Sequence, residues 1–423
     1  MIGPSLFIWS PVYLMTTSPS TPSTTSLSSE DAFDTLANDL SPNIAKHSIE
    51  SQVEQLAENK PQTRVENAAN HALEIGSNTP PKKQDIYYMN LAIEEAKKGL
   101  FTTRPNPAVG CVIVNNNLIV GTGYHPQAGQ PHAEVFALRE AKDNAKGATA
   151  YVTLEPCSHT GRTPPCAQAL INSGVSRVVV AGLDPNPKVA GRGIAMLKAA
   201  GIEVTVGVST QQAEQLNLGF LKAMRTQMPY VRLKIASSLD GRTAMASGES
   251  KWITGPAARE DVQKLRALSG AIITGSQTII DDNPSLNVRS SQLGVALDKV
   301  PQPKIVVLDR RQRLDQAHYK VFESPDTLLW AEHDLTALLH QLVTQYQVQD
   351  VLVEAGSQVS GSFIEAGLVD ELIVYQAPCL LGHSAKPMLN LTVDNLFLQH
   401  RFERVSVSEV GSDLKLVYKP VCQ

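Results

Sequence analysis

Short β-branched runs alternate with segments of helical pattern from about residue 85 to residue 418. This alternation constrains the fold most, because it is typical of α/β layer architectures. Asp85 is expected to cap the first helix. In the first half we expect strands at 109–114, 118–120, 151–154, 177–181 and 204–206, and helices at 85–98, 132–141, 166–172 and 194–200.

A second α/β unit is expected to begin at Pro229. Its expected strands cover 231–236, 271–274, 305–308, 328–330, 351–354 and 372–375, with helices at 259–268, 335–346 and about 360–366. Two last runs around Gly411, at 405–409 and 414–418, predict a closing antiparallel hairpin. Because no internal repeat is visible, we expect two different domains, at 83–228 and 229–423.

Residues 1–82 differ from the rest in composition. Residues 1–29 contain no charged side chain and are rich in Ser, Thr and Pro. They lack the basic start and unbroken apolar stretch of a secretory signal, and the arginines of a transit peptide. Such a segment cannot bury enough apolar surface to offset the entropy of ordering. We therefore expect a disordered, low-complexity extension without a catalytic role, and Met15 is an alternative start.

Charge and cysteine content exclude several classes of protein. The formal net charge is -4, from 37 basic and 41 acidic residues, which disfavours a nucleic-acid partner. No apolar run of membrane-spanning length occurs, so no membrane partner is expected. Five scattered cysteines do not make a disulfide scaffold. We expect a cytoplasmic protein that acts on small molecules.

The most specific pattern of reactive side chains in this sequence consists of His132, Glu134, Cys157 and Cys166. One His and two Cys leave a tetrahedral zinc with an open position for water, whose pKa the metal lowers. Glu134 follows His132 by two residues, so it is placed to move a proton rather than to bind metal. H-x-E with a later P-C-x-x-C is the signature of zinc nucleobase deaminases. This chain departs from that signature, because eight residues separate its two cysteines.

Other interpretations stay open on these residues alone. A structural zinc site needs four protein ligands, and His159 could be the fourth. A non-catalytic zinc module would not need Glu134, and a polynucleotide deaminase would need a basic groove, which the net charge disfavours. The sequence shows no comparable motif of metal-ligating residues around the other three cysteines. We therefore expect structural roles for Cys111, Cys379 and Cys422.

Longer stretches of the first half resemble the bifunctional riboflavin-biosynthesis deaminase/reductase family. These stretches are TTRPNP at 102–107, VGCVIV at 109–114, GQPHAE at 129–134, YVTLEPCSH at 151–159 and GRTPPC at 161–166. In that family an eight-residue gap between the two cysteines is normal. The spacing that departs from the general deaminase signature therefore supports the resemblance to this family.

The resemblance implies a cytidine-deaminase-like N-terminal domain. It implies that His132, Cys157 and Cys166 hold zinc. It further implies that Glu134 donates protons, and that Asn106 and His159 contact a pyrimidine. The implied reaction is hydrolytic deamination of diaminohydroxyphosphoribosylaminopyrimidine.

The second half lacks the G-x-G-x-x-G fingerprint of many dinucleotide sites. Instead, the expected strand at 351–354 leads into Gly356 and Ser357, and a helix follows from about 360. Free amides at a helix N-terminus can hold a phosphate. Gly356 and Gly361 would let a ligand approach the backbone closely. An ordinary tight turn has the same pattern.

The same family resemblance continues through the second half. It rests on LKIASSLDGR at 233–242, SGES at 247–250, WIT at 252–254, DDNPSL at 281–286, EAG at 354–356 and GLVDE at 367–371. It implies a dihydrofolate-reductase-like C-terminal domain that uses NADPH. The implied reaction reduces the ribosyl group of 5-amino-6-(5-phosphoribosylamino)uracil to ribityl. The family also suggests a homo-oligomer.

Carried over by position, the resemblance assigns two sets of residues. The NADPH site comprises Ala236, Trp252, Thr278, Asp282, Gly356, Ser357, Gln358, Val359, Ser360, Gly361 and Ser362. The substrate site comprises Ser250, Arg266, Leu286, Arg289 and Glu354. Arg266 and Arg289 are forked donors suited to a phosphate, although Arg266 alone could sit on a solvated helix face. Asp282 is the candidate acid/base, and Lys234 is a second polar group.

Overall fold

The computed structural model describes residues 82–158, 165–186 and 189–421. The extension predicted for residues 1–82 therefore lies outside the described residues, except for Lys82, and so do His159 and Cys422. Within the described ranges, no helix combines the length and the apolar character that a bilayer crossing requires.

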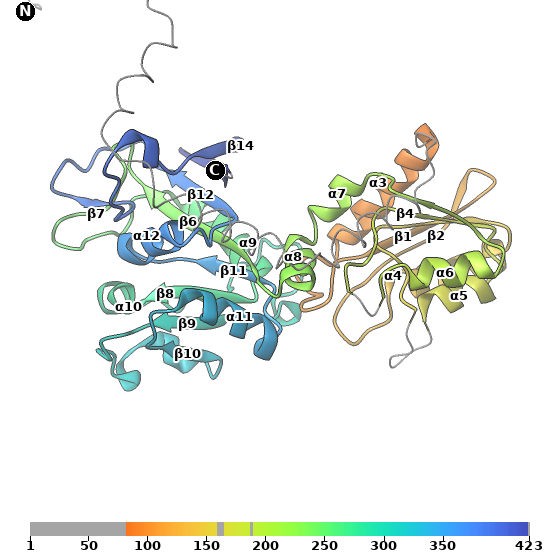
Figure 1. The fold of residues 1–423 in the computed structure, drawn as a ribbon, viewed down its shortest axis with the longest axis horizontal. Helices are drawn as coiled ribbons and strands as arrows, with labels where there is room; N and C mark the ends of the chain where they lie inside the picture. Colours follow the sequence, from red (N-terminus) through yellow and green to blue (C-terminus); the bar gives the residue numbers. More distant parts are fainter. Residues whose placement is uncertain (1–81, 159–164, 187–188, 422–423) are drawn as a thin grey trace, which may run out of the picture. The chain divides into compact units, whose positions relative to one another are not determined.

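A five-stranded mixed sheet organises the first half, in the order β2-β1-β3-β4-β5 (Figure 1). Its strands are β1 Gly110–Asn115, β2 Leu118–Tyr124, β3 Thr149–Val152, β4 Arg177–Val180 and β5 Glu203–Val206. β1 pairs antiparallel with β2 and β3, whereas β3, β4 and β5 run parallel. All five expected strands are present, and β2 extends beyond its predicted end at residue 120.

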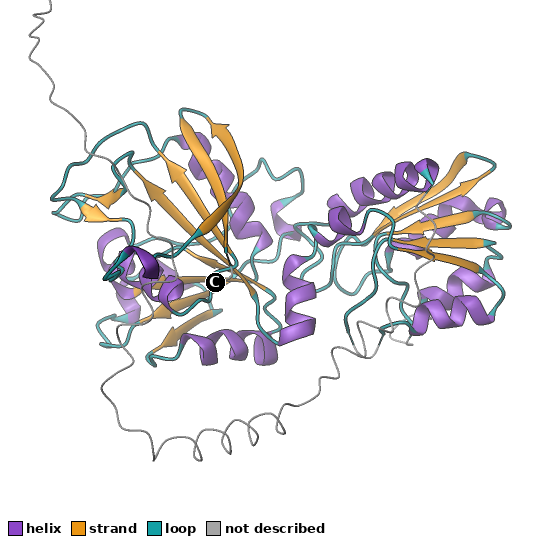
Figure 2. Cartoon of the chain, turned by 45° about the horizontal axis from the view of Figure 1, so that its top comes forward, coloured by secondary structure: helices purple, strands orange, loops and turns teal. Residues whose placement is uncertain are grey.

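Helices cover both faces of this sheet (Figure 2). They are α3 Lys83–Lys97, α4 Ala133–Ala141, α5 Cys166–Asn172, α6 Arg192–Ala199 and α7 Thr210–Glu214. Ile113 of β1 packs with α4, α5 and α6 on one face, and its neighbour Val112 packs with α3 on the other. Successive side chains of a strand point to opposite faces, so a strand covered on both sides needs the continuous apolar run seen in β1.

Asp85 does not cap α3, contrary to the expectation from sequence. The N-cap is Lys82, and Asp85 lies in the first turn, where it accepts hydrogen bonds from Arg177 Nη1 (2.7 Å), Arg177 Nη2 (3.0 Å) and Tyr151 Oη (3.0 Å). Although burial opposes ionisation, Arg177 holds the pKa of Asp85 below its ordinary value. The partner that decides this placement is distant in sequence, which is why capping rules missed it.

An eight-stranded sheet organises the second half, in the order β10-β9-β8-β11-β6-β12-β15-β14. Its strands are β6 Tyr230–Ser237, β8 Ala271–Gly275, β9 Lys304–Leu308, β10 Thr327–Trp330, β11 Asp350–Val353, β12 Glu371–Gln376, β14 Phe402–Val410 and β15 Asp413–Pro420. The strands from β10 to β12 run parallel, and the predicted hairpin β14–β15 joins β12 antiparallel. A small ladder of β7 Arg242–Ala244 with β13 Lys386–Pro387 was not expected.

Helices also cover both faces of the second sheet (Figure 1). The helices of this half and of the connector are α8 Leu218–Thr226, α9 Pro256–Leu268, α10 Ser276–Asp282, α11 Leu335–Tyr346 and α12 Ser357–Glu365. Leu338 of α11 and Phe363 of α12 are buried on one face, and Leu265 of α9 and Ile279 of α10 on the other. Short 3-10 turns lie at Lys142–Ala145, Leu297–Lys299, Gln316–His318, Lys320–Glu323 and Leu396–Leu398.

Two local expectations in this half are corrected. α12 starts at Ser357 rather than near residue 360, because Gly356 is already its extended N-cap. The DDNPSL stretch at 281–286 is expected to form a loop after the strand at 271–274, but Asp282 is the last residue of α10, which begins directly after β8. The seven residues of α10 are too few to show a helical period, so the sequence pattern did not reveal it.

Candidate active sites

The three predicted metal ligands come together in the first half. His132 is the N-cap of α4, Cys166 is the first residue of α5, and Cys157 follows β3. His132 Nδ1 lies 3.7 Å from Cys157 Sγ and 3.3 Å from Cys166 Sγ, and the three ligand atoms all lie within 4.8 Å of one another. Tetrahedral zinc with bonds of about 2.0–2.3 Å needs ligand atoms about 3.3–3.8 Å apart. The set therefore fits zinc.

The electrostatics of the two cysteines also suit a metal. A hydrogen bond from the Cys166 side chain, helped by His132, lowers the pKa of Cys157 to about 4. The Cys166 backbone N–H donates to Cys157 Sγ at 3.3 Å. The pKa of Cys166 is raised by its bond to Cys157 and by burial. Metal binding requires deprotonated thiols, and a cation between the sulfurs would favour the second deprotonation.

Glu134 is placed for proton transfer at this centre. It lies in the first turn of α4 and is 3% exposed. Its Oε2 is buried without a hydrogen-bond partner among the described residues. Burial raises the pKa of Glu134 above its ordinary value. Because buried polar atoms are nearly always hydrogen-bonded, an unpartnered carboxylate oxygen beside a metal set indicates a group that acts on a ligand.

Glu155 supports the centre without lining it. Its buried carboxylate accepts backbone N–H groups of Asp184 (3.3 Å), Gly191 (3.0 Å), Gly193 (3.0 Å) and Ile194 (3.4 Å). These bonds fix the start of α6 against the segment that carries Cys157. Sequence reasoning quoted Glu155 in its motif but gave it no role.

His125 is a site residue that sequence reasoning missed. The predicted pyrimidine contact Asn106 donates from Nδ2 to His125 Nε2 at 3.0 Å, while His125 Nδ1 faces Pro131 O at 3.1 Å. The ring centroids of His125 and His132 lie 5.2 Å apart, edge to face. His125 therefore connects Asn106 to the metal set. Only the turn-rich GYHP stretch at 123–126 could have signalled it.

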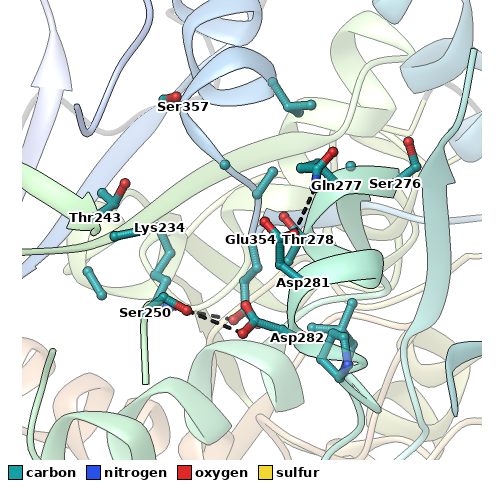
Figure 3. A pocket seen from close by; sticks show the side chains of 18 of the residues that line it. Lys234, Thr243, Ser250, Ser276, Gln277, Thr278, Asp281, Asp282, Glu354 and Ser357 are labelled. Atoms are coloured by element: carbon teal, nitrogen blue, oxygen red, sulfur yellow. Dashed lines mark hydrogen bonds and ion pairs between the residues drawn. The ribbon is translucent and has the colours of Figure 1, made fainter. Parts of the chain in front are cut away.

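The second half contains a cavity of about 950 Å³ at the carboxyl ends of its parallel strands (Figure 3). Of the residues predicted for the two reductase sets, the cavity is lined by Ala236, Ser250, Trp252, Arg266, Thr278, Asp282, Leu286, Arg289, Glu354, Gly356, Ser357, Gln358, Val359 and Ser362, and also by Lys234. Ser360 and Gly361 do not line it. Ser360 Oγ donates to Ala355 O, and a Cβ on Gly361 would lie 2.1 Å from Asn390 O. Gly361 thus serves packing, not ligand approach.

The start of α12 brings uncapped backbone N–H groups to the wall of this cavity. Gly356 is the N-cap, no side chain caps the helix, and Ser357 and Gln358 line the cavity. The first N–H groups of a helix have no intrahelical partner, and together with the helix dipole they attract a phosphate. A cavity of this volume with an anion site at one wall fits a dinucleotide.

Arg266 and Glu354 meet at the wall of the cavity rather than in solvent. Arg266 is 8% exposed and Glu354 is 9% exposed. Arg266 Nη1 also donates to Asn287 O at 3.2 Å, and Lys234 Nζ lies 3.6 Å from Glu354 Oε2. Although burial opposes ionisation, Arg266 and Lys234 hold the pKa of Glu354 at about 2. The alternative of Arg266 on a solvated helix face is therefore wrong.

Asp282 faces the cavity from the end of α10 (Figure 3). Ser250 Oγ donates to Asp282 Oδ1 at 3.2 Å, and Lys251 Nζ lies 3.4 Å from the same oxygen. The carboxylate is thus partnered on one side and open to the cavity. Asp282 and Gly356 line the same cavity, in agreement with the rule that ligand sites of α/β sheets lie beyond the carboxyl ends of the strands.

The other residues predicted to contact the substrate line a different part of the cavity wall. Leu286 is buried with a φ of 48°, a left-handed backbone that a leucine rarely adopts. Arg289 is exposed, and its Nη1 donates to Asn287 Oδ1 at 3.1 Å. Trp252 is 68% exposed, with the Arg259 guanidinium 4.4 Å from its ring centroid. Arg289 therefore has N–H groups free to meet a ligand.

Two family models match this chain. The cytidine and deoxycytidylate deaminase zinc-binding region matches residues 82–182, and the RibD C-terminal domain matches residues 229–416. The riboflavin biosynthesis protein RibD of Haemophilus influenzae is 50% identical over 364 residues, which cover 80% of this chain and 98% of that protein. The protein of the same name from Escherichia coli K12 is 50% identical over 363 residues, which cover 79% and 98%.

Solved structures agree with these matches. Acinetobacter baumannii RibD, form 1, is 54% identical with a TM-score of 0.78, and the match covers 80% of this chain and 99% of that one. The diaminohydroxyphosphoribosylaminopyrimidine deaminase/5-amino-6-(5-phosphoribosylamino)uracil reductase of Thermotoga maritima is 32% identical with a TM-score of 0.73, with the same coverage.

Proposed function

This chain belongs to the RibD family of bifunctional riboflavin-biosynthesis enzymes, and we propose how its residues divide the two reactions. It is a pyrimidine deaminase and a reductase that uses zinc and NADPH. We place the deaminase unit at residues 83–228 and the reductase unit at 229–423. The two matched ranges and the start of β6 at Tyr230 support this division.

In the deaminase unit, His132, Cys157 and Cys166 hold the zinc. When bound, zinc acts as a Lewis acid that lowers the pKa of a water and so supplies a nucleophile at neutral pH. Glu134 would accept one proton from the attacking water and deliver it through Oε2 to a ring nitrogen. It would then accept the remaining proton of the added hydroxyl group and deliver that one to the amine, which leaves as ammonia. The observation that carries this assignment is the buried, unpartnered Oε2 beside the three ligands.

In the deaminase unit, we propose that Asn106 orients the substrate. His125 Nε2 accepts from the Asn106 side-chain NH2 group, and the side-chain oxygen of Asn106 is the atom that we assign to the ligand. A pyrimidine offers amino and ring N–H donors to such an acceptor. His159 is proposed as a second pyrimidine contact from the family pattern alone, since it lies outside the described residues.

In the reductase unit, the cavity holds NADPH with its diphosphate at the start of α12. Bound NADPH supplies a hydride to the first carbon of the ribosyl group. Asp282 would deliver a proton to the ring oxygen as the bond between that oxygen and the first carbon breaks, so that the oxygen becomes a hydroxyl. Ser250 and Lys251 hold the Asp282 side chain in place. Arg289 binds the substrate phosphate. Arg266 keeps Glu354 ionised at the cavity wall, where Glu354 accepts from the pyrimidine N–H groups.

The partners of this enzyme are small-molecule substrates of the riboflavin pathway. We further propose that no nucleic acid takes part, which the net charge of -4 supports, and that the enzyme acts in the cytoplasm. A homo-oligomer is proposed as well. Its support is the edge strand β14, on which Val405 (53% exposed) and Val407 (47% exposed) are accessible. Sedimentation analysis of the purified chain tests this assembly.

A direct experiment tests the division of labour. The purified chain is given the diaminopyrimidine substrate, and ammonia release and NADPH oxidation are recorded separately. Ammonia release without NADPH, followed by NADPH oxidation when it is added, is expected. An absence of ammonia release by the zinc-loaded chain would refute the deaminase assignment.

A further inference from the structure

Arg289, which we assign to the substrate phosphate, lies in a segment that has no partner strand. Residues 287–290 belong to no helix or strand, so their backbone groups need other partners. The Gln302 side chain supplies two of them, because its Oε1 accepts the Val288 N–H at 2.9 Å and its Nε2 donates to Val288 O at 3.0 Å. Gln302 thus pairs with Val288 as the backbone of a neighbouring strand would.

Helix α9 also holds this segment, through three side chains that are spaced three residues apart. The contacts join Glu260 to the Ser290 hydroxyl, Gln263 Oε1 to the Arg289 N–H at 2.8 Å, and Arg266 Nη1 to Asn287 O at 3.2 Å. Residues three apart on a helix are neighbours on its surface, so the segment runs along one side of α9. Gln263 makes the middle contact and fixes the backbone from which the Arg289 side chain projects.

The hydrogen bond to Arg289 occupies only one half of the Gln263 amide. A backbone N–H must be accepted by an oxygen, so Oε1 faces Arg289 and Nε2 is left as a donor. Gln263 is 5% exposed and lines the cavity. Within the described ranges Nε2 has no hydrogen-bond partner, yet it is not sealed from solvent as Glu134 Oε2 is. The access that remains to Nε2 is therefore through the cavity.

The cavity wall around Gln263 suits an anion. Arg266 and Arg289 both line it, and the carboxylate of Glu354 is already paired with Arg266 and Lys234. Burial and the nearby Arg266 charge lower the pKa of Arg289 below its ordinary value. An anion bound beside Arg289 would stabilise the charged form of that side chain. A phosphate monoester has enough oxygens to accept from a guanidinium and from a neutral donor next to it.

We propose that Gln263 is a further substrate-binding residue of the reductase, and that its Nε2 donates to the substrate phosphate beside Arg289. The Oε1 of the same amide holds the backbone of Arg289, so one side chain orients a charged donor and adds a neutral one. The proposal rests on the proposed function, since it requires that the phosphoribosyl substrate lie in this cavity with its phosphate at Arg289.

Two variants separate the two halves of the amide. Gln263→Glu keeps an oxygen for the Arg289 N–H but places a second carboxylate oxygen where Nε2 lies. Gln263→Met is similar in length, carries no charge and removes both contacts. Dissociation constants are measured on the full-length, zinc-loaded chain with saturating NADP⁺, which cannot donate a hydride. The two ligands are 5-amino-6-(5-phosphoribosylamino)uracil and its dephosphorylated form.

Each variant is expected to bind the phosphorylated ligand about 10- to 100-fold more weakly, because a hydrogen bond to a charged group is lost. Binding of the dephosphorylated ligand should not change, since it offers no phosphate to Nε2. Gln345→Glu is the matched control, because Gln345 is exposed on α11, lies outside the cavity and also accepts through Oε1, from Gln341. It should bind both ligands as the wild type does, and thermal melts verify that each variant is folded.

A double-mutant cycle with Arg289→Ala needs only the uncharged variant and distinguishes direct contact from positioning. If Nε2 meets the phosphate itself, Gln263→Met still weakens binding of the phosphorylated ligand in the Arg289→Ala background. Loss of the whole effect in that background would show that Gln263 acts only through Arg289 and would overturn the inference. So would wild-type affinity of Gln263→Glu for the phosphorylated ligand, or an equal loss for both ligands. An Arg289→Ala variant that binds the phosphorylated ligand as the wild type does would instead refute the proposed phosphate site, and the inference with it.

Discussion

Arg266 and Glu354 form a buried, two-point ion pair at the wall of the large cavity of the second half. Arg266 Nε lies 2.6 Å from Glu354 Oε1, and Arg266 Nη2 lies 3.0 Å from Glu354 Oε2. The two residues are 88 positions apart in the chain, on α9 and directly after β11. The pair therefore joins a helix to the central part of the sheet and orients the Glu354 carboxylate at the cavity wall.

Glu354→Gln is expected to lower the free energy of unfolding by about 3–5 kcal/mol, because it leaves the buried Arg266 charge without its partner. Urea unfolding at neutral pH measures this difference, and Glu365→Gln, an exposed position on α12, is the control. The folded-state pKa of Glu354 is about 2, below its ordinary value of 4.5. A depressed pKa means that the stabilisation is present above about pH 4.5 and is lost as the pH falls toward 2. A variant as stable as the wild type at pH 7 would contradict this account.

Cys157→Ser is expected to remove the zinc, because the thiolate is the form that binds the metal and a serine hydroxyl does not supply it. Metal analysis of the purified protein should find one zinc per wild-type chain and none in the variant. Cys379→Ser is the control, since Cys379 belongs to no cluster of metal-ligating residues in the described part of the chain. Full zinc retention by Cys157→Ser would show that the ligand assignment is wrong.

Asp282→Asn is expected to reduce the ribosyl group about 10²–10⁴-fold more slowly, because the amide keeps the bond to Ser250 but cannot exchange a proton. NADPH binding and ammonia release should be unchanged. Arg289→Ala should mainly raise the KM for the substrate, because a phosphate clamp binds ground and transition states alike. Steady-state kinetics on the deaminated substrate separates the two effects. Reduction at the wild-type rate by Asp282→Asn would make Lys234 the next candidate.

Deletion of residues 1–80 is expected to leave both activities intact. The curated relatives from Haemophilus influenzae and Escherichia coli match over 98% of their own length while using only about four-fifths of this chain. Their counterparts of both units therefore need no such segment. Ammonia release and NADPH oxidation by the truncated protein provide the check, and a folded truncation that has lost either one would show that the segment serves a site.

Much of this organisation could be predicted from local patterns. The strands were visible because a strand covered on both faces needs a continuous apolar run, as in β1 and β11. The zinc set was visible because three ligands and a carboxylate fall within two short motifs, whose residues need only two helix starts and one strand end to meet. The spacing of residues in a sequence can therefore predict a site when its reactive side chains lie within a few short motifs.

Features that depend on distant partners were beyond such patterns. Arg266 has the spacing of a surface helix residue, and only Glu354, on another element, explains its burial. His125 has no motif of its own and gains its role from Asn106 and His132. In each case tertiary contacts, not local propensity, decide the position of the side chain.

The central claim is that two separate sites of one chain perform the two reactions, and Glu134→Gln tests it most directly. Ammonia release is measured on the diaminopyrimidine, and NADPH oxidation is measured in parallel on the deaminated substrate. Because the variant keeps the three metal ligands but loses the proton carrier, zinc content should stay at one per chain. Ammonia release should fall about 10²–10⁴-fold, and NADPH oxidation should match the wild type. Near-normal ammonia release with zinc in place would contradict the account and leave the zinc with a structural role.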